Sequence, residues 1–112
     1  MEIHSHDIGD VRLLSVAGDR IDAAVAIAFK DRIRALTDGA PDTVMLDLSA
    51  VTFIDSSGLG SIVAAMKQME HGRKLQLAGL TPNVDRVFRL TRMDKVFTIH
   101  ESSEAGLQQN GG

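Results

Sequence analysis

The sequence contains no cysteine, no tryptophan and no tyrosine, and it has no long apolar run. Without cysteine, the chain has no disulfide scaffold, no thiolate metal site and no cysteine nucleophile. No apolar stretch approaches the ~20 residues that cross a bilayer. The N-terminus lacks a basic region followed by an apolar stretch, so no signal peptide is expected. These absences predict a cytoplasmic protein without membrane insertion.

The sequence has no excess of positive charge, and aromatic side chains are scarce. The net charge is −3, and four phenylalanines are the only aromatic residues among 112. Nucleic-acid-binding proteins usually present a basic surface, and many stack aromatic side chains on bases. Nucleic acid is therefore not an expected partner. The length predicts a single domain over residues 1–112 with its own core, and we expect residues 107–112 to form a frayed tail.

The hydrophobic pattern alternates between strand and helix spacing. Ile3–Asp7 and Val11–Val16 predict a hairpin, because Gly9-Asp10 between them is a turn signal. Three helices are predicted, the first from Asp22 and the third from Thr81-Pro82. Their apolar stripes are Val25, Phe29, Ile33 and Leu36; Leu59, Ile62, Val63 and Met66; and Val84, Val87, Phe88 and Thr91.

Further strands are predicted over Thr43–Leu48, Leu75–Ala78 and Val96–Ile99, with residues 49–54 as a connection. Ser102 or Ser103 is expected to cap a short last helix. Strands separated by helices pair in parallel through right-handed crossovers, and the opening hairpin adds an antiparallel edge. We therefore predict a single-domain α/β fold with a mixed four- to five-stranded sheet and helices mainly on one face.

The hexapeptide Asp55-Ser56-Ser57-Gly58-Leu59-Gly60 follows an apolar run and opens the second helical pattern. The first N–H groups of a helix have no partner within the helix, and the helix dipole favours negative charge there. A serine at this turn could carry a phosphate without disturbing the fold. The stretch therefore predicts a protein-binding module that is switched by phosphorylation.

Structural explanations compete with this functional one. Asp55, Ser56 and Ser57 are all favoured helix caps, and one of them could serve only that purpose. Gly58 and Gly60 each cost up to about 1 kcal/mol relative to alanine in a helix. They could permit a sharp turn and close helix packing, or they could leave the turn open to another molecule. The spacing alone leaves both explanations open.

Motifs of catalysis are missing around this turn. A dinucleotide-binding fingerprint would need a third glycine at Val63, and no Gly-Lys-Ser/Thr loop is present. A nucleophile elbow needs glycine two residues before the serine, where Ile54 or Asp55 stands. No histidine is placed as a base for Ser56. We therefore expect no enzyme activity and no cofactor.

The residues Asp47-Leu48-Ser49 and Phe53-Ile54-Asp55-Ser56-Ser57-Gly58-Leu59-Gly60 resemble the signature of the STAS family. The resemblance is to its bacterial anti-sigma factor antagonists in particular. It extends over nearly the whole chain, through Gly72–Pro82 and Leu90–Phe97. The resemblance implies the STAS fold for the whole domain.

The resemblance also implies a function. In that family the serine directly after the aspartate is the phosphoacceptor, which is Ser56 here. The implied partner is an anti-sigma factor that is also a serine kinase. The unphosphorylated antagonist binds this partner and frees a sigma factor, phosphorylation releases the antagonist, and a serine phosphatase resets the cycle. The implied partner-binding residues are Asp55, Ser56, Ser57, Gly58, Leu59 and Asp22, although Gly18-Asp19-Arg20-Ile21-Asp22 is one residue longer than the usual Gly-x-Leu-Asp spacing.

Three alternatives stay open. The chain could be a STAS docking subunit of another assembly, such as a stress-signalling complex or a lipid transporter, without a switch. His4 and His6 lie on one face of a predicted strand and could share a metal, although an ordinary exposed edge is favoured. A group of cations near the third helix could be a solvated helix end or a docking patch for an acidic partner: Arg86, Arg89, Arg92 and Lys95.

Overall fold

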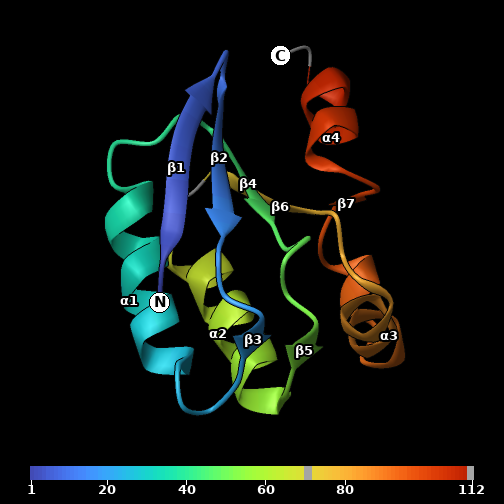
Figure 1. The fold of residues 1–112 in the computed structure, drawn as a ribbon. Coiled ribbons are helices and arrows are strands. Elements are labelled where there is room, and N and C mark those ends of the chain that lie inside the picture. Colours follow the sequence, from blue (N-terminus) through green and yellow to red (C-terminus); the bar gives the residue numbers. More distant parts are fainter. Residues whose placement is uncertain (70–71, 111–112) are drawn as a thin grey trace.

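The computed structural model describes residues 1–69 and 72–110 of the chain (Figure 1). A five-stranded sheet runs through its centre in the order β1-β2-β4-β6-β7. Its strands are β1 (Ile3–Ile8), β2 (Val11–Val16), β4 (Thr43–Asp47), β6 (Lys74–Ala78) and β7 (Ile99–His100). The hairpin partner β1 is antiparallel to β2, and every other neighbouring pair is parallel. The predicted mixed sheet is confirmed.

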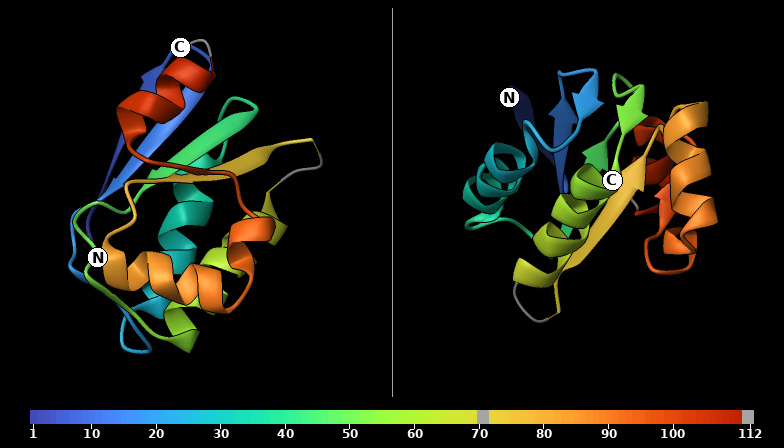
Figure 2. Two further views of the ribbon diagram at one scale, coloured as in Figure 1. Left: turned by 90° about the vertical axis from the view of Figure 1, so that its right-hand side faces the viewer. Right: turned by 90° about the horizontal axis from the view of Figure 1, so that it is seen from below.

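Three helices share the main core with one face of this sheet, and a fourth packs on the other face. The three are α1 (Ala26–Thr37), α2 (Ser56–Gln68) and α3 (Pro82–Leu90). Because side chains alternate along a strand, Val44 and Leu46 of β4 enter the main core, whereas Met45 enters a smaller cluster with Leu107 of α4 (Ser103–Gln109). In the left-hand view of Figure 2, α4 lies in front of the sheet and α1 lies behind it. Helices therefore lie mainly on one face, as predicted.

The predicted apolar stripes are buried or half-buried except at Thr91, which is exposed, and the first helix begins later than expected. Phe29 and Ile33, on the inner face of α1, are fully buried. The helix starts at Ala26 instead of Asp22 because the intervening N–H groups have other acceptors. The Asp22 carboxylate accepts the N–H of Ala24, and the N–H of Ala23 is donated to Asp55. Such local side-chain acceptors compete with helix formation.

The last strand is also displaced from its predicted place. Residues Met93–Lys95 form a 3₁₀ helix, η1, and strand β7 begins only at Ile99, so the prediction of a strand over Val96–Ile99 is wrong for its first three residues. The N–H groups of Val96 and Phe97 both donate to the carbonyl of Met93. Backbone groups committed to this turn cannot also pair with β6.

Two further predictions need correction. Residues 49–54 are not only a connection, because β5 (Phe53–Ile54) pairs in parallel with β3 (Arg20–Ile21). Residues 107–109 are not frayed, since they belong to α4, which ends at Gln109. The Asn110 side chain anchors this end by donating to Gln76 and to the carbonyl of Gly106. The rest of the predicted tail, residues 111–112, lies outside the described residues.

Candidate partner-binding site at the start of α2

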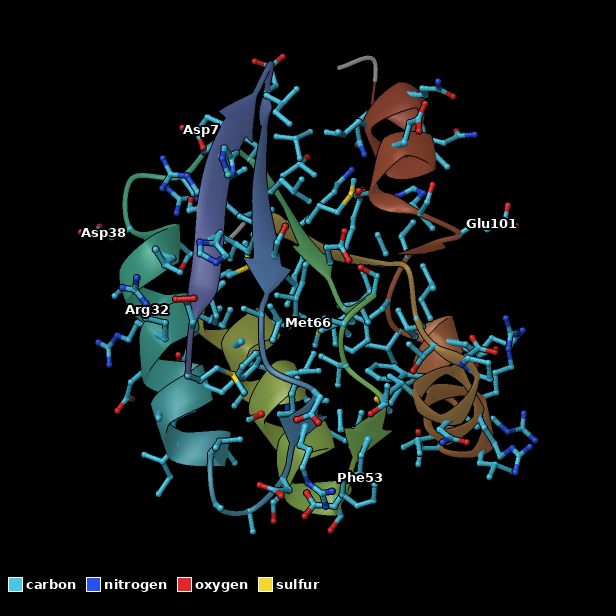
Figure 3. The ribbon with its side chains drawn as sticks, in the orientation of Figure 1. Asp7, Arg32, Asp38, Phe53, Met66 and Glu101 are labelled. Atoms are coloured by element: carbon cyan, nitrogen blue, oxygen red, sulfur yellow. The ribbon has the colours of Figure 1, made fainter. Side chains whose placement is uncertain are left out.

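The pairing of β3 with β5 assembles the candidate site. Arg20 is the register partner of Phe53, and Ile21 is the register partner of Ile54. Because the two strands are parallel, the residues that follow them meet at one edge. The turn that begins with Asp22 therefore lies beside the first turn of α2, which begins with Ser56. Figure 3 labels Phe53 at this lower end of the molecule.

Asp55 caps α2 and ties it to the neighbouring turn. Its Oδ1 atom accepts the N–H of Gly58 at 2.8 Å, and its Oδ2 atom accepts the N–H of Ala23 at 3.1 Å. The Gly58 N–H in particular lowers the pKa of Asp55 below its ordinary value, and the Ala23 N–H acts in the same direction. The carboxylate is therefore ionised at neutral pH, and both of its oxygens are occupied.

The serine hydroxyls after Asp55 are free for chemistry. Ser56 and Ser57 are exposed and are the first two residues of α2. Asp55, and neither serine, supplies the side-chain cap. In the part of the chain that the structure describes, neither hydroxyl makes a hydrogen bond. The arrangement presents two unengaged hydroxyls at the positive end of a helix dipole, where an added anion is favoured.

The two glycines of the turn have different explanations. A Cβ atom on Gly58 would lie 1.9 Å from the carbonyl oxygen of Ile21 and 2.9 Å from the Ile54 side chain. Only glycine permits this approach of α2 to β3. A Cβ atom on Gly60 would meet nothing within 4 Å. The close-packing explanation therefore applies to Gly58, and the open-surface explanation applies to Gly60.

Asp22 lies at the same edge and is half-buried. Its carboxylate accepts the N–H of Ala24 at 3.1 Å and faces the Arg20 guanidinium at 3.3 Å. The same guanidinium lies 4.4 Å from the centre of the Phe53 ring, within the range of a cation–π contact. The structure thus brings together the predicted residues Asp22, Asp55, Ser56 and Ser57. Gly58 is buried and Leu59 packs partly against the core, so their share of the surface is smaller.

Apolar side chains beside the serines were missed in the sequence analysis. Ile27 of α1 is 73% exposed, and Phe53 is 41% exposed. A shallow groove of about 210 Å³ runs between α1 and α2, with Ile27, Lys30, Ser57 and Gly60 in its lining. A signal for Ile27 was present, because it is a large apolar residue outside the stripe of its own helix.

Other candidate chemistry finds no support in the described ranges. His4 and His6 are exposed on the edge strand β1, and no group of three or more potential metal-ligating side chains occurs within residues 1–69 and 72–110. Among the helices that the structure describes, none has the length and apolar character needed to span a membrane.

A family model for the STAS domain matches residues 2–106. This chain belongs to the STAS family. It is similar to the anti-sigma-B factor antagonist of Bacillus subtilis (strain 168), with 29% identity over 96 residues that cover 85% of this chain and 86% of the relative.

The fold of this STAS chain is shared with solved antagonist structures. The crystal structure of an anti-sigma factor antagonist from Mycobacterium paratuberculosis superposes with a TM-score of 0.86 at 28% identity, covering 96% of this chain and 92% of the other. The unphosphorylated form of the anti-sigma factor antagonist SpoIIAA gives a TM-score of 0.73 at 20% identity, covering 99% and 98%. The phosphorylated form of SpoIIAA, described as a Bacillus cell fate determinant, gives a TM-score of 0.69 at 18% identity, covering 96% of this chain and 98% of the other. At these identities the SpoIIAA structures show a common fold alone.

Proposed function

We propose that this chain is an anti-sigma factor antagonist that is switched by phosphorylation of Ser56. In the unphosphorylated state it binds an anti-sigma factor that is also a serine kinase, and so frees a sigma factor. The phosphorylated chain is released, and a serine phosphatase restores it. This role places the protein in the cytoplasm as a substrate of the kinase and not as an enzyme. The names of its STAS relatives support the first part of this proposal.

The proposal rests on one observation: Asp55 has a structural role at this turn, whereas the Ser56 hydroxyl has none. Asp55 provides the helix cap through Gly58 and also fixes the turn at Ala23. Ser56 is therefore exposed without a structural duty of its own. Its esterification breaks no hydrogen bond of the described structure, so the phosphorylated protein is expected to remain folded. The added phosphate then affects only the binding of a protein that covers this turn.

The charge that a phosphate adds is large enough for a switch. A phosphoserine carries about −1.5 to −2 charges near neutral pH. A partner that covers Ser56 must remove water from this anion beside the ionised Asp55, which is a like charge. A loss of ~4 kcal/mol in binding free energy weakens affinity about a thousandfold. Exchange of partners then needs no large rearrangement of the fold.

The binding surface has polar and apolar parts. Asp55, Ser56 and Ser57 form its centre, and Asp22 borders it. Ile27 and Phe53 add exposed apolar area. Apolar area is the main source of affinity in protein interfaces, and the polar centre provides the site where charge can oppose it.

The proposal is tested by phosphorylation in vitro. The protein is incubated with ATP and each anti-sigma factor kinase of its own genome, and intact mass and fragment spectra locate the phosphate. We expect one added phosphate on wild type and on the matched control Ser57→Ala, and none on Ser56→Ala. Circular dichroism confirms that both variants are folded.

Two results would oppose the proposal. Phosphate on Ser57 alone would move the switch to the neighbouring residue. If no cognate kinase modifies the chain, and Ser56→Asp binds its partner as tightly as wild type, the turn is a permanent docking surface. The chain would then be a STAS subunit of another assembly.

A further inference from the structure

A second exposed apolar surface lies where α3 ends. Leu90, the last residue of α3, is 76% exposed, and Val96, which follows η1, is 50% exposed. The neighbouring Phe88 and Phe97 are buried and meet edge to face, with ring centres 6.0 Å apart. These buried rings anchor the segment from beneath. Leu90 and Val96 are thus presented to solvent by a backbone that is already fixed.

Uncompensated positive charge surrounds these two side chains. Arg89 pairs with Asp85 at 2.8 Å and approaches Asp94 at 3.8 Å. Arg86, Arg92 and Lys95 are also exposed, and within residues 1–69 and 72–110 none of these three forms an ion pair. The chain as a whole has a net charge of −3, so this positive region differs in sign from the molecule around it. We call Leu90, Val96, Arg86, Arg92 and Lys95 the α3–η1 patch.

The backbone of Arg92 adds a second indication. Its φ of 63° lies in the left-handed region, and among the described residues it is the one non-glycine residue with positive φ. A side chain there costs roughly 1–2 kcal/mol that glycine avoids. An arginine at a strained surface position, with no ion pair in the described structure, points to use of its charge by another molecule.

We propose that the α3–η1 patch is a docking surface for a second protein, through a segment with one or two apolar side chains flanked by Asp or Glu. The apolar side chains would cover Leu90 and Val96, and the carboxylates would pair with the three free cations. The five residues of the patch differ from those of the Ser56 turn and its groove, and α3 lies on the opposite side of α2 from α1 in Figure 1 and the right-hand view of Figure 2. The proposal therefore does not depend on the proposed function.

The observations favour an acidic protein over an anionic membrane. The patch offers only two large apolar side chains, and the inner face of the nine-residue α3 is occupied by the buried Val84 and Phe88. No continuous apolar helix face is left to enter a lipid surface, as interfacial helices require. The arginine guanidinium binds a carboxylate or a phosphate equally well through two hydrogen bonds, so the missing apolar helix face is what favours a protein segment over a membrane.

The experiment is a selection of displayed random peptides of about 12 residues on the folded protein. We expect the enriched peptides to contain an apolar or aromatic residue flanked by acidic ones. The double variant Leu90→Ser, Val96→Ser should weaken their binding about tenfold or more. Arg86→Gln with Lys95→Gln should weaken binding about fivefold or more and reduce its salt dependence. Ile8→Ser is the control, because Ile8 is an exposed apolar side chain at the end of β1 and belongs to neither of the two surfaces, and it should leave binding unchanged.

Arg92→Gly separates a docking role from a structural one. It removes a cation and relieves the backbone, so peptide binding should fall while thermal stability does not. The proposal is overturned if no peptide is enriched, if the enriched peptides lack acidic residues, or if Leu90→Ser, Val96→Ser binds them as wild type does. Binding to phosphatidylglycerol vesicles that depends on Leu90, without enrichment of acidic peptides, would overturn it in favour of a membrane.

Discussion

The surface around the start of α2, which includes Ile27 of the neighbouring α1, and the α3–η1 patch expose apolar side chains to almost the same extent, 73% for Ile27 and 76% for Leu90. They differ in how their charged groups are used. At the start of α2, both oxygens of Asp55 accept backbone N–H groups. At the α3–η1 patch, the described structure gives Arg92 no ion pair and a strained backbone.

This difference supports the different roles proposed for the two regions. At the start of α2, the hydrogen bonds of Asp55 fix the turn and leave the neutral hydroxyls of Ser56 and Ser57 at the surface. In the proposed function, a partner detects a phosphate added there. Where the charges are not engaged, they remain available to attract a partner from a distance. Substitutions at Gly58 and Asp55 should therefore destabilise the fold, whereas Arg92→Gly should not.

The largest effect on stability is expected for Gly58→Ala. Its new Cβ atom would lie 1.9 Å from the Ile21 carbonyl oxygen, which is backbone and cannot rotate away. We expect the free energy of unfolding to fall by about 3 kcal/mol. Gly60→Ala is the matched control, since its Cβ atom meets nothing, and it should stabilise the helix by up to about 1 kcal/mol. Urea denaturation measures both, and equal effects at the two positions would remove the close-packing explanation.

Asp55→Asn should have the next largest effect. The amide can still accept one N–H, but its NH₂ group would oppose the N–H of Ala23, which now donates to Oδ2. We expect thermal scanning at pH 7 to give a melting temperature lower by about 4–8 °C. An unchanged melting temperature would show that the Ala23 contact does not stabilise the fold.

The pH dependence of this difference follows from the lowered pKa of Asp55. A carboxylate with a depressed folded-state pKa stabilises the protein above its unfolded value, 3.8, and this contribution is lost as pH falls through the lower folded value. The gap in melting temperature between wild type and Asp55→Asn should therefore be constant from neutral pH down to pH near 4 and should narrow below it. A gap that closes near pH 6 would contradict the assignment.

Arg92→Gly should act in the opposite direction. Relief of the left-handed strain exceeds the greater entropy of an unfolded chain with glycine, so the free energy of unfolding should rise by about 0.5 kcal/mol. Chemical denaturation of the variant checks this value. A loss of stability would mean that the arginine side chain supports the fold, and the second indication for the α3–η1 patch would be lost.

The smallest effects are expected for Ile27→Ser and Leu90→Ser. Both side chains are mostly exposed, so each substitution should change stability by less than about 0.5 kcal/mol. Thermal melts of the two variants, run in parallel, test whether both side chains belong to available surfaces. If one variant is strongly destabilised, that side chain serves the core and is not part of an available surface.

The sequence predicted the layers of the fold because burial imposes a spacing. The stripe with Phe29 and Ile33 is buried as its period indicates, and the alternation of β4 divides Leu46 from Met45 between two clusters. The turn at Ser56 was located because a capping residue and two glycines follow an apolar run there.

Structural features that depend on contacts between residues far apart in the sequence could not be predicted. Strands β3 and β5 contain two residues each, too few to show a period. The delayed start of α1 depends on a hydrogen bond from Ala23 to Asp55, 32 positions away along the chain. The close approach at Gly58 likewise depends on Ile21, on another strand. The role of each predicted site residue in binding a partner stays a prediction.

The most direct test of the phosphorylation switch is the affinity of the chain for its anti-sigma factor before and after phosphorylation of Ser56. Isothermal titration calorimetry of the two forms, both checked for folding by circular dichroism, gives the two dissociation constants. We predict that phosphorylation weakens binding about a thousandfold while the fold is retained. Equal affinities of two folded forms would contradict the switch.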